Sequence, residues 1–381
     1  MLFLCKLCME SGTNKMSEKI SLALSGGGSR AMAFHAGALR YFAELGLLES
    51  VAEISSVSGG SLLTGLILTK SGMHWPTSQE YVTDVFGKVR CTLCTTNIQA
   101  SAAIRLVSPR YWRFFGSLPN LVARAIYMDW RVRGTLNDLP QSPIWSINCT
   151  TAENGRRFRF KQGRLGDYES GYAEAGEFPL ASAMATSAAF PVGIGPFRLY
   201  AKRLAWWKKP SWGAKVEEKI PPPYELMHLY DGGVYDNLGL EPLFSASTGL
   251  PNKEHCVIVL DAGAPLGRGF GMSSLNPFRI KRLMDVMMDQ TRALRVRGFI
   301  SYVKQHKRGG YLGIVRTKNI REVLEKQPDR SSFLSEELAT RVTNFPTSLS
   351  RLDEADFDVI ARHGYEMAKL TQIGFPYLPS A

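Results

Sequence analysis

Long apolar runs are missing from this 381-residue sequence. No stretch reaches the roughly 18 consecutive apolar residues that a membrane-spanning helix needs, so no transmembrane helix is predicted. The apolar start, residues 1–6, is too short for the core of a signal peptide, and no small-residue cleavage site follows it. We therefore expect residues 1–18 to be a loose leader. No linker divides residues 19–381, so we expect them to form a single domain.

Cysteine is also scarce. Six residues are too few for this length to indicate a disulfide framework, so reduced cysteines in a cytoplasmic protein are expected. Two Cys-x-x-Cys pairs, Cys5 with Cys8 and Cys91 with Cys94, could in principle form a four-thiolate zinc site. The pairs lie far apart in the sequence and neither has the glycine-rich knuckle of a zinc ribbon, which argues against such a site.

Acidic residues are outnumbered, with 34 Asp and Glu against 46 Lys and Arg, and the formal net charge is +12. Such an excess suits an anionic partner, either a nucleic acid or an anionic membrane surface, and charge alone does not choose between them. Internal repeats and low-complexity tracts are absent as well. With 45% hydrophobic and 21% charged residues, the composition is that of an ordinary globular protein.

The clearest pattern is a strand-helix-strand-helix unit near the start of the predicted domain. Residues 20–24 are a short apolar run, typical of a buried strand, and lead into a glycine-rich loop at 25–30. Apolar residues then recur with helical spacing over 34–45. A second predicted strand at 54–57 is followed by an apolar helical run over 62–69. This βαβ unit predicts an α/β fold with a mainly parallel central sheet flanked by helices.

Later segments give weaker patterns. Helices with breaks are predicted within 75–145, and residues 201–224 are predicted to be irregular because of their Trp-Trp-Lys-Lys-Pro and Pro-Pro-Pro runs. A long amphipathic helix is expected at about 280–304, with its Met-rich apolar face in the core, and a last helix over 352–372. Further strands are predicted at 144–149, 157–160, 257–260 and 311–315.

The glycine-rich loop and Ser58 are predicted to lie side by side. One complete crossover separates Gly28 from Ser58, so the strands that precede them run parallel, about 4.8 Å apart, and end at the same edge of the sheet. Ligands of open parallel sheets bind at that edge.

The segment around Ser58 fits a nucleophile elbow. A serine hydroxyl is a poor nucleophile until a base removes its proton, and the oxyanion that it generates needs preset donors. In an elbow the serine lies on a tight strand-to-helix turn, and the small neighbours Ser56, Gly59 and Gly60 would let the strand and the helix approach closely.

The loop and a downstream carboxylate could supply the other parts of such a site. Gly26, Gly27 and Gly28 at a helix start would leave backbone N–H groups as an oxyanion hole, with positive charge from Arg30. Asp231 precedes the small residues Gly232 and Gly233, and its burial against the serine would raise its pKa from about 3.9 towards a useful value.

Two other carboxylates compete with Asp231. Asp261 ends the predicted strand 257–260 and is the second candidate for the base. Asp236 is expected only to hold the turn that follows it.

Four motifs in order, at 26–30, 56–60, 185–191 (Ala-Thr-Ser-Ala-Ala-Phe-Pro) and 231–233, resemble the patatin-like phospholipase family. The resemblance covers residues 19–263, and residues 276–381 would be a helical C-terminal extension of the same domain. It implies a three-layer α/β fold and hydrolysis of phospholipid acyl esters by a Ser–Asp dyad without a catalytic histidine.

The resemblance also assigns roles. It makes Ser58 the nucleophile and Asp231 the base, with the oxyanion hole formed by the loop glycines and Arg30. It implies no metal or organic cofactor, no nucleic acid polymer as partner, and a cytoplasmic protein that associates peripherally with membranes. Two positions depart from the family pattern: Ser56 replaces the first elbow glycine, and Ala31 replaces the last glycine of the loop.

Alternatives to this assignment remain open. An ordinary α/β-hydrolase triad would add His255, His306 or His363, although only about two strands precede Ser58 here, whereas several precede the elbow in that fold. The loop could instead hold a nucleotide phosphate, but no Gly-Lys-Ser/Thr follows the glycines and no acidic residue closes the next strand. His35 could touch the site and is more simply a structural residue.

Two alternatives concern function. The protein could be an effector whose phospholipase activity requires a cyclic nucleotide activator, or a non-catalytic lipid-binding module on the same fold. The aromatic and basic clusters at 111–115 and 206–212 could be membrane-interface anchors or ordinary packing; for 206–212 a surface or lid role is favoured, because the run has no core periodicity.

Overall fold

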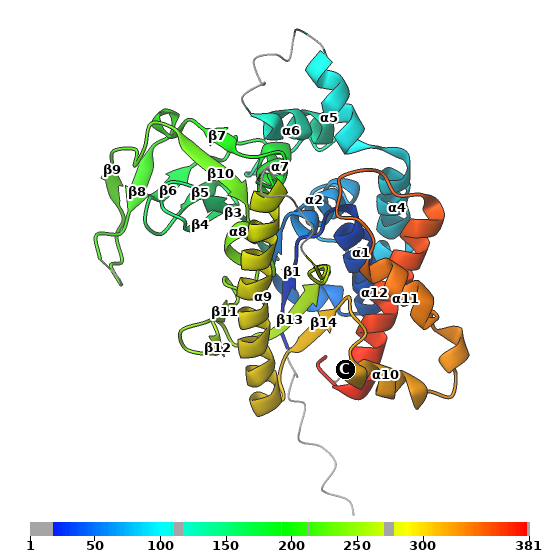
Figure 1. Cartoon of the computed structure of the whole chain (residues 1–381). Coiled ribbons are helices and arrows are strands. Elements are labelled where there is room, and N and C mark those ends of the chain that lie inside the picture. The colour runs from blue at the N-terminus through cyan, green and yellow to red at the C-terminus, as the bar shows by residue number, and fades with distance from the viewer. Residues whose placement is uncertain are drawn as a thin grey trace, which may run out of the picture.

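Five parallel strands form one side of the central sheet and reach its edge (Figure 1). The computed structural model describes residues 18–107, 109, 117–191, 193–211, 213–269 and 278–378. β1 and β2 are parallel neighbours, which confirms the predicted crossover and the α/β class. The five strands lie in the order β14 (Gly310–Gly313), β13 (Cys256–Asp261), β1 (Ile20–Leu24), β2 (Val51–Val57) and β3 (Ile144–Thr151).

An antiparallel extension continues the sheet beyond β3. Its strands are β4 (Arg157–Lys161), β5 (Arg164–Asp167), β6 (Gly171–Glu174), β8 (Trp206–Lys208) and β9 (Glu218–Ile220). β10 (Met227–Asp231) pairs antiparallel with both β3 and β7 (Phe197–Leu199), and a separate two-stranded sheet joins β11 (Phe244–Ser245) to β12 (Leu250–Pro251).

The prediction of an irregular segment at 201–224 was wrong, because β8 and β9 lie within it. Trp206 is fully buried in β8, and its indole N–H donates to the carbonyl of Ala201 at 2.8 Å. A surface role for this tryptophan is therefore excluded. Pairing with β6 and β9 supplies backbone partners that the local sequence does not reveal.

Helices cover both faces of the parallel strands and make three layers. On one face, Leu22 and Leu24 pack in a cluster with α1 (Gly28–Glu44), α2 (Gly59–Lys70) and α12 (Glu354–Gly374). On the other face, Ala23 packs with Phe299 and Tyr302 of α9 (Phe278–His306). The split follows from the pleat, since successive side chains of a strand point to opposite faces.

The segment at 75–145 is helical with breaks, as predicted, and the cluster at 111–115 lies outside the described residues. Its helices are α3 (Ser78–Glu80), the π-helix η2 (Tyr81–Val85), α4 (Phe86–Thr95), α5 (Ile98–Val107) and α6 (Leu118–Asp129). The other helices are α7 (Leu180–Ser187), α8 (Gly233–Asp236), α10 (Lys318–Glu325), α11 (Glu336–Thr343) and the 3₁₀ turns η1 (Leu48–Ser50), η4 (Ala201–Arg203) and η5 (Arg330–Ser332). Across the described part of the chain, no helix has the length and apolar character to cross a bilayer.

The long helix α9 is present as predicted, but the prediction that its apolar face lies in the core was wrong. Ile280, Leu283, Met287 and Leu294 are between 60% and 62% exposed. Only its C-terminal part, around Phe299 and Tyr302, is buried against the sheet. Periodicity showed that the helix has an apolar face and could not show which way that face points.

Candidate active site

Ser58 lies on the turn that joins β2 to α2. Its φ of 49° and ψ of −118° are unusual for a residue with a side chain, as expected for a nucleophile elbow. A Cβ at Gly59 would lie 2.5 Å from the carbonyl oxygen of Gly28, and one at Gly60 would meet the carbonyl of Leu24. The two glycines therefore allow the elbow to contact the glycine-rich loop directly, as the crossover predicted.

A chain of hydrogen-bonded hydroxyl groups stabilises the elbow. The Ser58 N–H donates to Ser187 Oγ at 3.0 Å, and Ser187 Oγ donates to the carbonyl of Asn148 at 2.7 Å. Ser61 Oγ lies 2.9 Å from Ser187 Oγ and 2.8 Å from Ser56 Oγ. Ser56 Oγ also accepts from the indole N–H of Trp145 at 2.8 Å. The serine that replaces the first elbow glycine thus belongs to a continuous hydrogen-bonded network.

Ser187 is the functional residue that the sequence reasoning missed. It ends α7, within the Ala-Thr-Ser-Ala-Ala-Phe-Pro motif, whose presence was noted without a role for any residue. Its hydroxyl fixes the backbone of Ser58 from a helix that lies far from the elbow in the sequence. The motif was the available signal, but only the tertiary contact shows what it does.

Asp231, the last residue of β10, is brought to Ser58 by the pairing of β10 with β3. Its side chain is buried, and burial raises its pKa from 3.8 to about 7. A hydrogen bond from the Gly233 N–H, at 2.7 Å, and the nearby Ser58 side chain act on the pKa in the opposite direction. A Cβ at Gly232 would lie 2.5 Å from the Asn148 carbonyl, so the Asp-Gly-Gly turn fits closely against β3.

Two backbone N–H groups of the glycine-rich loop have no hydrogen-bond acceptor within the described residues. Among the described residues, the N–H groups of Gly27 and Gly28 donate to no other group, and both glycines have positive φ values of 140° and 62°. The Gly26 N–H donates instead to the Asn237 carbonyl at 3.0 Å, and the Ser29 N–H to the Ser348 carbonyl at 2.8 Å. The geometry thus leaves the N–H groups of Gly27 and Gly28 available to a ligand.

Arg30 has a structural role as well as a positive charge, because backbone carbonyls hold its guanidinium in place. Its guanidinium donates to the carbonyl of Ala262 at 3.0 Å and to that of Phe345. Burial lowers its pKa to about 10, which still leaves it charged at neutral pH. Arg30 therefore ties the loop to β13 and the C-terminal segment while its positive charge stays beside the cavity.

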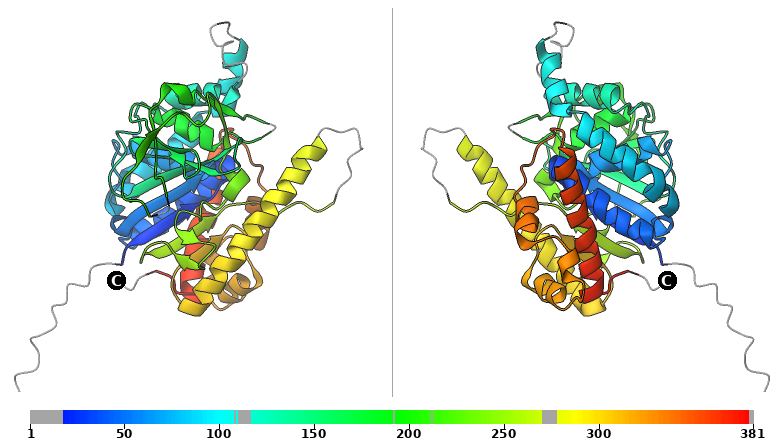
Figure 2. Two further views of the ribbon diagram at one scale, coloured as in Figure 1. Left: turned by 90° about the vertical axis from the view of Figure 1, so that its left-hand side faces the viewer. Right: turned by 90° about the vertical axis from the view of Figure 1, so that its right-hand side faces the viewer.

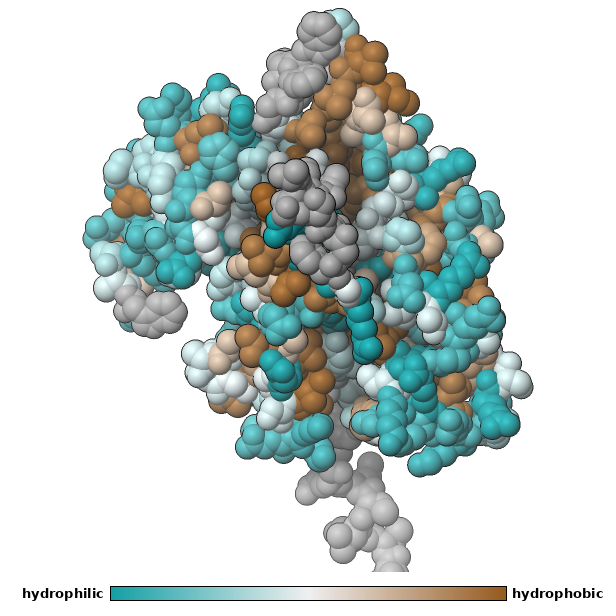
Figure 3. All heavy atoms as spheres, in the orientation of Figure 1, coloured by the Kyte–Doolittle hydropathy of each residue, from teal (hydrophilic) through white to brown (hydrophobic). Residues whose placement is uncertain are grey.

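Ser58, Asp231, Gly27 and Gly28 line one cavity of about 740 Å³. One wall is apolar and comes from α5, α6 and the segment after α7: Ala102, Ala103, Leu106, Leu118, Leu121, Val122, Phe190 and Ile194. The facing wall comes from α9 and is mostly charged: Lys281, Arg282, Asp285, Asp289 and Arg292. Figure 3 shows the hollow below the apolar end of α5. The cavity thus joins an apolar compartment to a charged one at the serine.

No histidine approaches the dyad. All six lie in the described part of the chain, and none lines the cavity. His35 is buried against the Ser25 carbonyl, and burial lowers its pKa to about 4. His255 contacts Ser21 and His363 contacts the Ile314 carbonyl. An ordinary triad is therefore not assembled.

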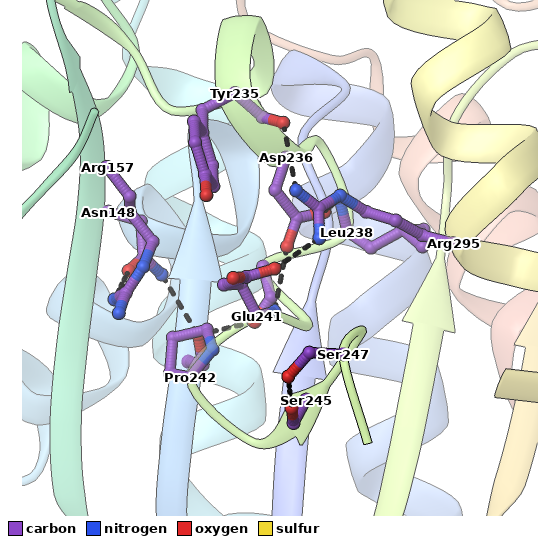
Figure 4. Close-up of polar contacts among 12 residues, drawn as sticks. Asn148, Arg157, Tyr235, Asp236, Leu238, Glu241, Pro242, Ser245, Ser247 and Arg295 are labelled. Carbon is purple, nitrogen blue, oxygen red and sulfur yellow. Dashed lines mark hydrogen bonds and ion pairs between the residues drawn. The ribbon is translucent and has the colours of Figure 1, made fainter. Parts of the chain in front are cut away.

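The competing carboxylates are engaged elsewhere. Asp261 forms an ion pair with Arg292 at 2.7 Å and accepts from the Tyr311 hydroxyl at 2.6 Å. Asp236 accepts from the N–H groups of Leu238 and Glu241, at 3.1 Å and 2.9 Å, so it holds the turn as expected. Figure 4 shows this turn beside Arg295 of α9, which contacts both Glu241 and Asp236.

Zinc-binding geometry is not found among the described residues. Cys91 and Cys94 lie together on α4, one exposed and one half-buried, whereas Cys5 and Cys8 lie outside the described range. Within that range, no three or more His, Cys, Asp or Glu side chains gather as metal ligands would.

The sequence model of the patatin-like phospholipase family matches residues 22–244, which is more than half of the chain. The protein belongs to the patatin-like phospholipase family. Membership agrees with the motifs that meet at the cavity. No curated protein matches the sequence at a significant level.

Solved structures with this fold include human GIVD cytosolic phospholipase A2. Its TM-score is 0.52 at 14% identity, with 93% of this chain and 59% of that chain covered. Its complex with methyl gamma-linolenyl fluorophosphonate gives 0.51 at 16% identity, covering 93% and 57%. Identities this low show the fold alone, and our chain spans less than two thirds of the human structures.

Proposed function

We propose that the protein hydrolyses acyl esters of membrane phospholipids through a covalent intermediate on Ser58, with Asp231 as the base. The observation that carries the proposal is that a strained Ser58 and a buried Asp231 line one cavity together with the loop glycines whose backbone N–H groups are unengaged. All of these groups face a cavity with an apolar wall.

The geometry supports a two-step reaction. Asp231 accepts the Ser58 proton as Oγ attacks the ester carbonyl, and the N–H groups of Gly27 and Gly28 stabilise the oxyanion. Collapse breaks the ester C–O bond, and the leaving alkoxide takes the proton from Asp231. Water then attacks the acyl-serine with Asp231 again as base, which releases the fatty acid and restores Ser58. A pKa near 7 suits a group that both accepts and returns a proton.

The cavity walls support a phospholipid substrate. About 740 Å³ falls in the usual range of ligand pockets, and the α5 and α6 wall offers apolar contact to an acyl chain. Arg282 on the facing wall, which pairs with no carboxylate among the described residues, would favour an anionic headgroup, whereas Lys281 is already paired with Asp285 at 2.7 Å. A long-chain ester can therefore reach Ser58 with its acyl tail against the apolar wall and its headgroup against the charged wall.

The test is fatty-acid release from mixed phospholipid vesicles by wild type, Ser58→Ala, Asp231→Asn and the control His306→Gln. Each dyad variant should lose roughly a thousandfold or more in rate. His306 lies outside the cavity and stacks on Tyr302, so its variant should keep full activity. Release undiminished in Ser58→Ala would refute the proposal, and loss in His306→Gln would revive a triad.

The two alternative functions are tested in the same assay. Release that appears only after a cyclic nucleotide is added would make the protein a ligand-activated effector. A protein that binds vesicles, releases nothing and resists labelling by a fluorophosphonate would be a lipid-binding module, whereas Ser58-dependent labelling would exclude that alternative.

A further inference from the structure

We propose that the outer side of α9 and the end of α5 form one docking face for an anionic lipid bilayer. The face consists of Ile104 and Val107 of α5 and Ile280, Leu283 and Met287 of α9. The inference rests on the proposed function, because it assumes that the ester enters the cavity from a membrane. It adds which surface meets that membrane.

Helix α9 has its polar side turned inward and its apolar side turned outward. Lys281, Asp285 and Asp289, spaced at i, i+4 and i+8, line the cavity. Ile280, Leu283 and Met287, spaced at i, i+3 and i+7, are 60% to 61% exposed. A surface helix of a globular protein normally has the opposite arrangement, so the outer stripe indicates an apolar partner outside this chain.

The orientation of α9 is fixed by its C-terminal half. Arg292 pairs with the buried Asp261 at 2.7 Å, and Arg295 contacts Glu241 from the turn after α8. Phe299 and Tyr302 then pack against the sheet. The first turns of the helix therefore extend from an anchored base, and Figure 2 shows them projecting from the body.

Helix α5 shows the same division on the other side of the cavity. Ala102, Ala103 and Leu106 line the cavity, whereas Ile104 and Val107 are 71% and 80% exposed. In Figure 2 the end of α5 projects from the top of the molecule and the first turns of α9 slant outward from the adjoining side, and Figure 3 shows apolar residues over both. A flat apolar surface could touch both helix ends while the cavity opens between them.

Charge favours an anionic bilayer as the occupant. The first turn of α9 carries three basic residues, Arg279, Lys281 and Arg282, and the whole chain has a net charge of +12. Lys281 and Arg282 line the cavity, and Lys281 also pairs with Asp285 at 2.7 Å. An apolar stripe beside basic residues is the pattern of helices that lie in the membrane interface. Each basic residue near an anionic leaflet adds attraction that a zwitterionic one does not provide.

The test measures binding of the inactive Ser58→Ala protein to vesicles of phosphatidylcholine with and without phosphatidylglycerol. We expect strong binding only to the anionic vesicles. Leu283→Gln/Met287→Gln and Ile104→Gln/Val107→Gln should each lower the partition coefficient by at least about tenfold. Leu250→Gln/Ile373→Gln, which changes two residues that are 46% and 44% exposed on β12 and at the end of α12, should leave it unchanged.

A second readout separates this inference from the proposed function. The same double variants with Ser58 intact should hydrolyse a water-soluble short-chain ester at the wild-type rate, because their side chains do not line the cavity. If Ser58 proves inactive on every ester, the vesicle binding still decides the docking face.

Three results would overturn the inference. One is failure of the Ser58→Ala protein to bind anionic vesicles, and another is unchanged binding by both face variants. The third is a wild-type dimer that Leu283→Gln/Met287→Gln converts to a monomer without loss of vesicle binding, since α9 would then be an interface between two copies.

Discussion

Asp231 couples chemistry and stability at the residue scale. Its carboxylate is held at the end of a buried strand, where it accepts from the Gly233 N–H and lies near the Ser58 side chain. These two contacts offset only part of the cost of burying the ionised carboxylate, so its pKa is still raised to about 7. Because this carboxylate is easily protonated at neutral pH, we predict that both the activity and the stability of the protein depend on pH in this range.

The first prediction concerns activity. In the proposed mechanism the ionised form of Asp231 accepts the serine proton, so kcat/KM should rise with pH and level off above a midpoint near 7. Below the midpoint, the rate should fall about tenfold per pH unit. The measurement is hydrolysis of a soluble ester between about pH 5 and pH 9. A profile that is flat through neutrality would argue against Asp231 as the base.

The second prediction concerns stability. A carboxyl whose pKa rises on folding binds more protons in the folded state, so the free energy of unfolding falls as pH rises from about 4 through about 7. Asp231→Asn removes this titration and should be more stable than wild type at pH 8, by on the order of 1–4 kcal/mol, and equal to it near pH 4. Thermal unfolding of both proteins at the two pH values provides the measurement, and a variant that is less stable at pH 8 would contradict the assignment.

At the scale of elements, the closest helix packing joins α1 to α12. A Cβ at Gly37 of α1 would overlap the carbonyl group of Ala361, and one at Gly364 of α12 would overlap the carbonyl of Phe34. Each helix thus presents a glycine to the backbone of the other. Helix α1 also begins at the glycine-rich loop, so this contact anchors the helix that carries Gly28.

We therefore predict that Gly37→Ala destabilises the protein by about 1–3 kcal/mol, because one methyl group must separate two packed helices. Gly298→Ala is the matched control: this glycine lies in α9 with open space around it, so alanine should stabilise by up to about 1 kcal/mol. Thermal unfolding monitored by circular dichroism compares the two. Similar effects of both substitutions would mean that helix packing is not the cause.

At the scale of the whole molecule, charge and shape act together. The net charge of +12 raises the concentration of the protein at any anionic surface, but the apolar helix ends decide how it is oriented there. Long-range attraction and local insertion should therefore respond differently to salt.

Binding of the Ser58→Ala protein to anionic vesicles should weaken by about tenfold or more between 0.1 M and 1 M salt, as the Debye length falls from about 10 Å to about 3 Å. The weak binding to phosphatidylcholine vesicles should change little, because apolar contact is not screened. Vesicle sedimentation over a salt series measures both. Equal salt sensitivity on the two vesicle types would contradict an electrostatic contribution.

Much of the candidate site could be predicted from the sequence because its parts are local turns. A glycine-rich helix start, a serine between a strand and small residues, and Asp-Gly-Gly after a strand each require particular residues at adjacent positions. The crossover from Gly28 to Ser58 also placed two of these turns side by side, since parallel strands end at the same edge.

Only the tertiary structure decided which groups these turns contact. Ser187 reaches Ser58 through a contact across 129 residues, and Arg30 bonds to Phe345 across 315, distances that no local pattern encodes. The pairing of β8 with β6 and the outward orientation of the apolar face of α9 are likewise not encoded in any local pattern. Periodicity determines that an element has an apolar side, whereas the packing of the whole chain determines whether that side meets the core or remains exposed.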